Sequence, residues 1–218
     1  MIYITGDIHA DIKRFSLKKL GKKDTLIVCG DFGFIWDGSD QEKKLLKKIG
    51  SFPFKTLFID GTHENFDLLF SYPLVEIYGG QAHQIYGNLF HLIRGQIYEI
   101  ENKKIFAFGG GESTDKEERI LYNKWWPQEF PKIDEMKNEV RLLNQVNRSV
   151  DYIVTHEPPS KIKVLFFKSF GNINPLNRFF DDVSKEISYK KWFFGSTHET
   201  RNIAQKYQSV FSEFIPLN

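Results

Sequence analysis

Short apolar runs recur along this 218-residue chain and alternate with more polar segments. Three of them lie within residues 1–5, 24–30 and 55–60, and two more lie within 151–155 and 191–194. Continuous apolar runs of this length are typical of strands that are covered on both faces. We therefore predict buried strands at these five places.

Helical spacing of apolar residues appears between the strand-like runs. Ser39 and Glu42 have the spacing of a capping box, and Gly50 is a usual stop residue for the helix that they begin. The segment 161–174 is ambiguous and is expected to be a loop or a short helix. Helices are predicted over 11–20, 39–50, 64–70 and 133–148.

The middle of the chain, from residue 74 to 109, shows another pattern. Short runs of strand-forming residues alternate there with glycine and asparagine turn signals. This pattern predicts a mostly antiparallel meander, and the tail over 203–214 is expected to close as a hairpin. The meander strands are predicted over 75–78, 83–86, 89–93, 96–100 and 103–108.

Alternation of strands and helices predicts an α/β architecture, and no repeat or linker divides the chain. We therefore expect one domain over residues 1–218. The 30 basic and 28 acidic residues leave a net charge of +2, which does not support a nucleic-acid partner. Cys29 is the one cysteine, so no intramolecular disulfide can form, and its apolar run predicts a core position.

No targeting segment and no apolar run long enough to cross a bilayer is evident in the sequence. We therefore expect a cytoplasmic protein without a membrane partner. The oligomeric state is open at this stage.

Metal-binding residue types follow the predicted strands. Aspartate, histidine and glutamate gather there behind a glycine or threonine, and four of the six histidines are among them. In open α/β sheets, ligands bind in the crevice beyond the carboxyl ends of the strands. The clusters lie at 6–9, 30–33, 61–65, 155–159 and 195–199.

Carboxylate and imidazole groups together suit Mn, Fe or Zn ions. Such an ion can activate a water and stabilise charge on phosphoryl oxygens, while a further imidazole can protonate a leaving group. Each cluster alone could be an ordinary strand-end turn, but five in one chain predict a site for a divalent metal ion.

The clusters, in this order, resemble those of the calcineurin-like metallophosphoesterases over nearly the whole chain. The matching residues are Gly6-Asp7-Ile8-His9, Gly30-Asp31, Gly61-Thr62-His63-Glu64, His156 and the segment 195–198. The resemblance implies a four-layer α/β/β/α sandwich of two mixed sheets. It also implies hydrolysis of a phosphomonoester or phosphodiester by a metal-activated water at a two-metal site.

The resemblance further implies a role for each residue by its position. Asp7, His9 and His198 would hold the first metal. Asp31 would bridge both ions, and His156 would hold the second. His63 would be the imidazole that serves the leaving group without binding a metal.

Two positions depart from the family pattern, and both concern the second metal. Thr62 stands where the family usually has an asparagine ligand, and Ser196 stands where it usually has a histidine. Three outcomes are open: a hydrolase with one metal, a second metal bound only together with substrate, or a weakened relative that binds a phosphorylated ligand or a partner. Because the first set and His63 are intact, we favour retained hydrolysis.

Further residues are candidates for phosphate contacts. Lys116 and Arg119 follow the glycine-rich stretch 109–111, although they could equally lie on a solvated helix face. Arg201 could meet a substrate phosphate or form a surface ion pair, and Asn65 is a further candidate. The substrate class, including nucleic acid, is not resolved by these residues.

Two other features have simpler interpretations. Trp125 and Trp126 could stack on a base or a partner, but packing is the better expectation. His83 and His91 lie in the predicted meander, away from the strand-end clusters, and are expected to pack at the surface or in the core.

Overall fold

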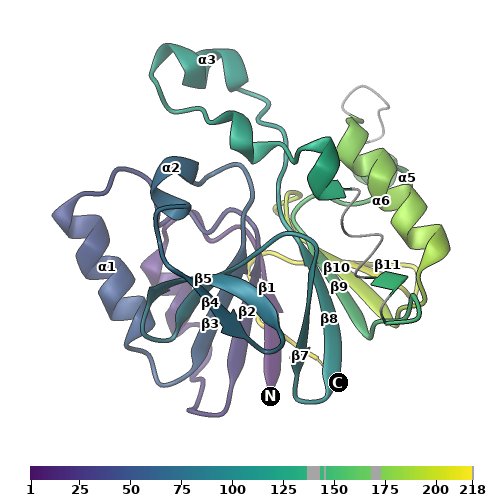
Figure 1. Ribbon diagram of the computed structural model, residues 1–218, viewed down its shortest axis with the longest axis horizontal. Coiled ribbons are helices and arrows are strands. Elements are labelled where there is room, and N and C mark those ends of the chain that lie inside the picture. Colours follow the sequence, from purple (N-terminus) through teal and green to yellow (C-terminus); the bar gives the residue numbers. More distant parts are fainter. Residues whose placement is uncertain (137–142, 145, 168–172, 218) are drawn as a thin grey trace.

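The computed structural model describes residues 1–136, 143–144, 146–167 and 173–217. Within them, the strands form two mixed sheets that face each other, with helices on the outer side of each (Figure 1). Layers of helix, sheet, sheet and helix are the predicted sandwich. None of the described helices is long and apolar enough to cross a membrane.

The first sheet has seven strands among the described residues. In spatial order they are β13 (Ile215–Pro216), β1 (Ile2–Thr5), β2 (Thr25–Cys29), β3 (Lys55–Ile59), β6 (Leu89–Leu92), β5 (Gly80–Tyr86) and β4 (Leu74–Ile77). The second has six in the same part of the chain: β11 (Arg201–Ile203), β12 (Tyr207–Ser209), β10 (Lys191–Phe194), β9 (Tyr152–Thr155), β8 (Lys103–Phe108) and β7 (Gln96–Ile100).

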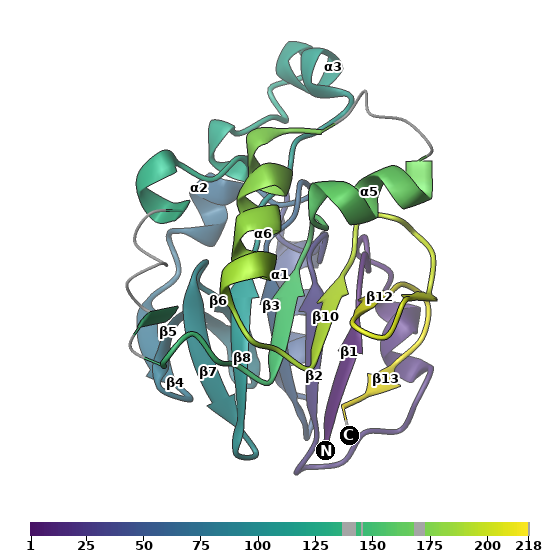
Figure 2. The same ribbon diagram turned by 90° about the vertical axis from the view of Figure 1, so that its right-hand side faces the viewer.

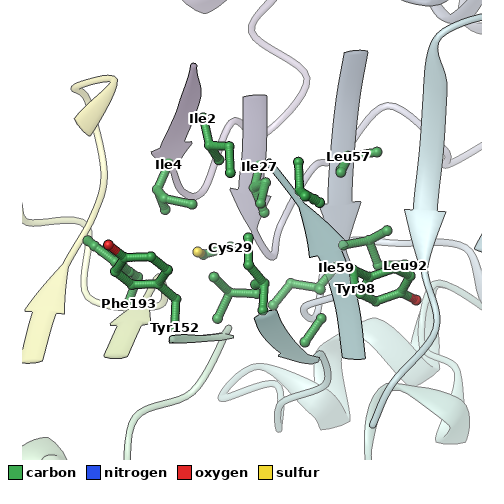
Figure 3. Close-up of a cluster of buried hydrophobic side chains, with 14 of the residues drawn as sticks. Ile2, Ile4, Ile27, Cys29, Leu57, Ile59, Leu92, Tyr98, Tyr152 and Phe193 are labelled. Atoms are coloured by element: carbon green, nitrogen blue, oxygen red, sulfur yellow. The ribbon is translucent and has the colours of Figure 1, made fainter. Parts of the chain in front are cut away.

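Alternation of side chains along each strand builds a core on both faces of each sheet. Ile2 and Ile4 of β1 point into the cluster between the sheets, whereas Tyr3 packs on the helix side. Figure 3 shows the inner cluster, in which Cys29 and its neighbours face Tyr152 and Phe193 of the second sheet. Cys29 is fully buried, as its apolar run predicted.

Helices cover the two outer faces. The helices among the described residues are η1 (Ile12–Ser16, a 3₁₀ helix), α1 (Asp40–Gly50), α2 (Phe66–Leu69), α3 (Lys116–Leu121), η2 (Pro127–Glu129, also 3₁₀), α5 (Ser160–Phe167) and α6 (Pro175–Glu186). Figure 2 shows α5 and α6 over the second sheet. Helix α3 is set apart from both layers, on the side toward which β1 runs (Figure 1).

Parallel pairing brings the carboxyl ends of neighbouring strands to the same side of each sheet. In the first sheet β1, β2 and β3 are parallel neighbours, and in the second β8, β9 and β10 are. Because the two sheets face each other, their carboxyl ends bring together the loops that follow β1, β2, β3, β9 and β10.

The meander prediction is wrong in one respect, because its strands divide between the two sheets. Strands β4 to β6 are antiparallel in the first sheet, and β7 with β8 in the second, but β6 pairs with β3 and β8 with β9 in parallel. The chain crosses between β6 and β7, where Arg94 turns inward and Gly95 has a φ of 74°. Local turn signals report a reversal but not which sheet receives the next strand.

Other boundaries also differ from the predictions. The helix expected over 11–20 is only η1, and the one expected over 64–70 is only α2. The closing hairpin is β11 with β12, earlier than the expected 203–214. The ambiguous segment begins as α5, whereas 168–172 lie outside the described residues, as does most of 137–145 in the helix expected over 133–148.

Helix α6 is absent from the predictions, although its sequence signals are clear. Asn174 and Asn177 form a reciprocal capping box, and Pro175 occupies the first turn. Leu176 and Phe180 then recur at helical spacing and are fully buried over the second sheet.

After β12 the chain crosses back to the first sheet to form β13. In this crossing segment, over 210–214, the carbonyl oxygen of Phe211 accepts a hydrogen bond from the Thr5 hydroxyl at 2.7 Å and another from the Arg14 guanidinium. The crossing segment therefore ties the end of β1 to the chain that leaves β12.

A buried ion pair holds the loop after β3 against the β6–β7 crossing. Asp60 is 1% exposed, accepts from Arg94 Nε at 2.9 Å and contacts His91 Nε2 at 3.0 Å. Burial would raise the pKa of Asp60, but Arg94 and His91 outweigh it and hold that pKa well below its usual range. His83 stacks on His91, and both imidazoles are core residues, as expected.

Removal of this cation tests its contribution to the fold. We expect Arg94→Met to lower the free energy of unfolding by roughly 3–5 kcal/mol, because it leaves a buried carboxylate without its cation. Arg148→Met is the matched control, since Arg148 pairs with Glu186 at the surface, where such pairs contribute about 1 kcal/mol or less. Equal losses in urea denaturation of the two variants would contradict this account.

Candidate metal centre

Six side chains from five loops meet between the carboxyl ends of the two sheets. Asp7 and His9 follow β1, Asp31 follows β2 and His63 follows β3. His156 follows β9 and His198 follows β10, so the second sheet supplies the rest. All six are the strand-end residues that the sequence singled out.

The loops hold these residues in a backbone conformation that side chains disfavour. The residues with positive φ include Asp7 (46°), His9 (48°), Asp31 (47°), Ser196 (58°) and His198 (49°). Residues in such regions cost of order 1–3 kcal/mol each and cluster at functional sites. The surrounding fold therefore imposes this geometry, which the local sequence would not adopt by itself.

Close approach at the centre also requires glycine at two loop positions. A Cβ on Gly30 would lie 2.3 Å from Nδ1 of His156, and one on Gly61 would lie 2.2 Å from Oδ1 of Asp31. Neither contact is sterically allowed, so these glycines let His156 and Asp31 reach the centre.

The residues assigned to a first metal face one another closely. Nε2 of His198 lies 3.0 Å from Nε2 of His9 and 3.6 Å from Oδ2 of Asp7. Nε2 of His9 lies 3.6 Å from Oδ2 of Asp31. Ligand atoms that share an ion at about 2.1 Å are about 3.0–3.4 Å apart, so these separations suit a common cation.

An unpaired oxygen supports the same interpretation. Oδ2 of Asp7 is buried and has no hydrogen-bond partner among the described residues, and such an atom is costly unless something compensates it. A divalent cation among two carboxylates and two imidazoles would satisfy it, and these donors fit Mn, Fe or Zn.

A second group of possible ligand atoms lies beside the first. One possible ligand atom from each of Asp7, Asp31 and His156 lies within 4.8 Å of the other two. The same holds for one atom from each of His9, Asp31 and His63. Nδ1 of His156 lies 3.2 Å from the carbonyl oxygen of Cys29, and its Nε2 lies 3.5 Å from Oδ1 of Asp31. A proton on Nδ1 would bond that carbonyl and leave Nε2 free as a ligand.

Thr62 and Ser196, the two positions that depart from the family pattern, contact the centre through their backbone N–H groups. Thr62 N donates to Oδ1 of Asp31 at 2.6 Å, and Ser196 N donates to Oδ1 of Asp7 at 3.2 Å. The Thr62 hydroxyl is 3.4 Å from the same Asp31 oxygen. That oxygen also accepts from His63 N at 3.1 Å, so its hydrogen-bonding capacity is largely used within the chain.

Burial and crowded charges perturb the ionisation of the centre. Burial, together with the nearby charge of Asp31, raises the pKa of Asp7 to about 7. Burial lowers the pKa of His9 to about 4. At His156 burial is outweighed by the charges of Asp31 and Asp7, which raise its pKa to about 9. Such opposed shifts within a few ångströms are typical of functional sites.

His63 connects Asp31 to α3. Its Nδ1 lies 2.8 Å from Oδ2 of Asp31, and its Nε2 lies 3.0 Å from the Arg119 guanidinium. Burial would lower the pKa of His63, but the hydrogen bond to Asp31 outweighs it and raises that pKa. Arg119 also donates to the carbonyl oxygen of Thr62 at 2.6 Å and pairs with Asp115 at 2.8 Å.

Glu64 organises two of the loops, a role that the sequence did not reveal. Its Oε1 accepts from Phe32 N at 2.8 Å, and its Oε2 accepts from Gly61 N at 2.8 Å. The side chain is 1% exposed, and burial with the nearby Asp31 charge raises its pKa to about 8. The signal in the sequence was an acidic residue directly behind Thr62 and His63.

The remaining candidates lie elsewhere. Asn65 caps α2, accepting from Leu68 N and donating to the Trp36 carbonyl oxygen, so its amide is already paired. Lys116 lies over the Trp125 ring and Arg201 over the Phe166 ring. Of the four proposed phosphate contacts, only Arg119 therefore touches a residue of the centre. Trp126 packs against the hydrophobic cluster on the helix side of the first sheet and donates to Asp67, in line with the packing expectation.

Comparison with known proteins agrees with this architecture. A family model described as calcineurin-like phosphoesterase matches residues 1–200, whereas no curated protein matches the chain. The fold is similar to that of a phosphopantetheinyl hydrolase from Mycobacterium tuberculosis, with a TM-score of 0.50 and 15% identity over 96% of this chain and 89% of that one. A protein of unknown function from Aquifex aeolicus gives 0.37 and 13%, over 87% of each chain.

The loop-organising role of Glu64 can be tested by metal binding. We expect Glu64→Gln to lower Mn²⁺ affinity about 10–100-fold in calorimetric titration, because its amide cannot accept from both loops and Asp31 loses its support. Glu76→Gln, at an exposed position on β4, should leave the affinity unchanged. An unaltered affinity in Glu64→Gln would show that the loops hold Asp31 without this carboxylate.

Proposed function

We propose that this chain, which belongs to the calcineurin-like phosphoesterase family, hydrolyses phosphoric mono- or diesters with the help of a divalent metal ion. Asp7, His9, Asp31 and His198 would hold that ion, with Mn, Fe or Zn as the metals that suit their donor atoms. When bound, it supplies a lowered pKa to a water molecule and withdraws charge from phosphoryl oxygens.

One observation carries the proposal. Two buried carboxylates and two imidazoles from both sheets come within 3.0–3.6 Å of a neighbour in the set, and one carboxylate oxygen has no partner among the described residues. Such an arrangement is costly without a cation. The strained loop conformations support a functional rather than a structural origin for it.

Chain residues would also bind and protonate the ester. As an imidazolium, His63 would keep its Nδ1–H directed to Asp31 and, once Arg119 has turned away from Nε2, would donate the Nε2 proton to the leaving oxygen. Arg119 contacts the same Nε2 and would turn to a phosphoryl oxygen, for which its fork of donors is suited. Asp31 would thus orient His63 as well as bind the metal.

A weakened second metal site is the reason to consider an alternative function. Thr62 and Ser196 offer hydroxyl groups where stronger ligands are usual, so we propose one tight metal per chain. A weakened site could instead serve a protein that binds a phosphorylated ligand or a partner without turnover. Hydrolysis is favoured because His63 keeps its contact with Asp31.

Loss of Asp31 tests the enzyme proposal. We expect Asp31→Asn to reduce Mn²⁺-dependent hydrolysis of aryl phosphomonoesters and diesters at least about 100-fold, since a ligand and the partner of His63 are lost together. Asp40→Asn, in the exposed first turn of α1, should retain activity. An unchanged rate in Asp31→Asn would remove this residue from the reaction, and a folded wild type without metal-stimulated turnover would support the binding protein.

Restoration of the usual ligands tests the state of the second site. We expect Thr62→Asn combined with Ser196→His to raise the metal content from one ion per chain toward two, with a faster turnover. Elemental analysis of the purified double variant and wild type measures this directly. Two tightly held ions in the wild type would show that Thr62 and Ser196 do not weaken the site.

A further inference from the structure

A cavity of about 270 Å³ opens beside His63, between the loop after β2 and α3. Its lining includes the rings of Trp36, His63 and Tyr122, together with charged groups of α3 and Lys124. Pockets for drug-sized ligands are about 300–1,000 Å³. This one is therefore sized for a smaller group.

The position of the cavity identifies which part of a substrate it would receive, and this step rests on the proposed function. His63 contacts Asp31 through Nδ1, whereas its Nε2 is directed to Arg119, which also lines the cavity. A leaving oxygen must come within hydrogen-bond distance of Nε2 to receive a proton there. The alcohol part of the ester would thus extend into this cavity.

Aromatic rings dominate the apolar surface at this place. The Trp36 ring lies 6.4 Å from that of His63, with 26° between their planes, and meets the edge of Trp126 at 5.5 Å. Trp126 is itself held by a hydrogen bond to Asp67 at 3.0 Å. Tyr122, which also lines the cavity, is 67% exposed. Exposed aromatic faces beside a polar site are suited to stacking with flat rings.

Charge in the lining is balanced. Asp115 pairs with Arg119 at 2.8 Å, and Glu118 and Lys124 bring one further charge of each sign. This balance does not favour a polyanionic strand beyond the reacting phosphate. A larger cavity of about 580 Å³ on the Ser196 side has no aromatic side chain among its described lining residues.

We propose that the cavity beside His63 binds a flat aromatic ring of the leaving alcohol, so that the substrates are phosphoric esters of aryl alcohols or of nucleosides. Trp36 is the main stacking surface, and Tyr122, the residue that follows α3, contacts the ring as well. The preference is a property of binding and does not depend on the rate of the chemical step.

Non-hydrolysable phosphonates test this proposal without reliance on turnover. The probes are methylphosphonate, phenylphosphonate and the phosphonate isostere of adenosine 5′-phosphate, each titrated calorimetrically into Mn²⁺-loaded protein. We expect at least one aromatic probe to bind about 5–100-fold more tightly than methylphosphonate, as the contribution of one stacked ring implies. Preference for the phenyl or the adenosine probe distinguishes aryl from nucleoside esters.

Variants assign the preference to this cavity. Trp36→Leu should remove most of it, Trp36→Phe should keep most of it, and Tyr122→Ala should reduce it in part. Trp125→Leu is the matched control, because Trp125 is a half-buried tryptophan that contacts Lys116 outside the cavity, and it should keep the full preference.

The outcomes separate this inference from the proposed function. Equal affinities for all three probes would overturn the inference while leaving metal-dependent hydrolysis intact, as would an aromatic preference that survives Trp36→Leu and Tyr122→Ala. Absence of any phosphonate binding would overturn it too. Retention of the preference by a protein without any turnover would support the cavity assignment and count against the enzyme.

Discussion

Mutual repulsion between Asp7 and Asp31 is the constraint on which this structure depends. Both carboxylates are almost inaccessible to water, and each raises the cost of charge on the other. The fold brings them together nevertheless, with imidazoles from both sheets around them. The backbone is strained to do so, with a positive φ at Asp7, His9, Asp31 and His198. Such an arrangement is stable only when positive charge compensates it. Burial alone would raise the pKa of Asp31, but the charges of His156, His63 and His9 outweigh it and hold that pKa well below its usual range. A cation held by both carboxylates would likewise stabilise the folded chain.

Buried charged residues outside the set of candidate ligands hold the loops that carry the two carboxylates. Glu64 joins the loops after β2 and β3, and the pair of Asp60 with Arg94 fixes the latter loop to the crossing between the sheets. Arg94 also donates to the carbonyl oxygen of Gln128, close to the segment from which α3 projects. Arg94 therefore links the loop after β3 to η2.

Much of the fold and of the candidate site could be predicted from the sequence. Buried parallel strands appear in it as local apolar runs, and the carboxyl ends of parallel strands lie at the same edge of a sheet. Asp7, His9, Asp31, His156 and His198 were found in this way. Local patterns could not show that β6 and β7 belong to different sheets, since a turn looks the same in either case. The pairing of Asp60 with Arg94, 34 residues apart, and the loop-bridging role of Glu64 depend on tertiary contacts. The left-handed backbone at Asp7 and Asp31 is imposed by those contacts and opposes local preference.

The crossing segment after β12 has a consequence for how the centre exchanges its contents. Phe211 stacks on His198, and its carbonyl oxygen is held by Thr5 and Arg14 beneath the loop of Asp7. These contacts join the two sheets directly beside the candidate metal centre. Opening by a hinge between the two sheets would break these hydrogen bonds, so any ligand of the centre would have to enter without separation of the sheets.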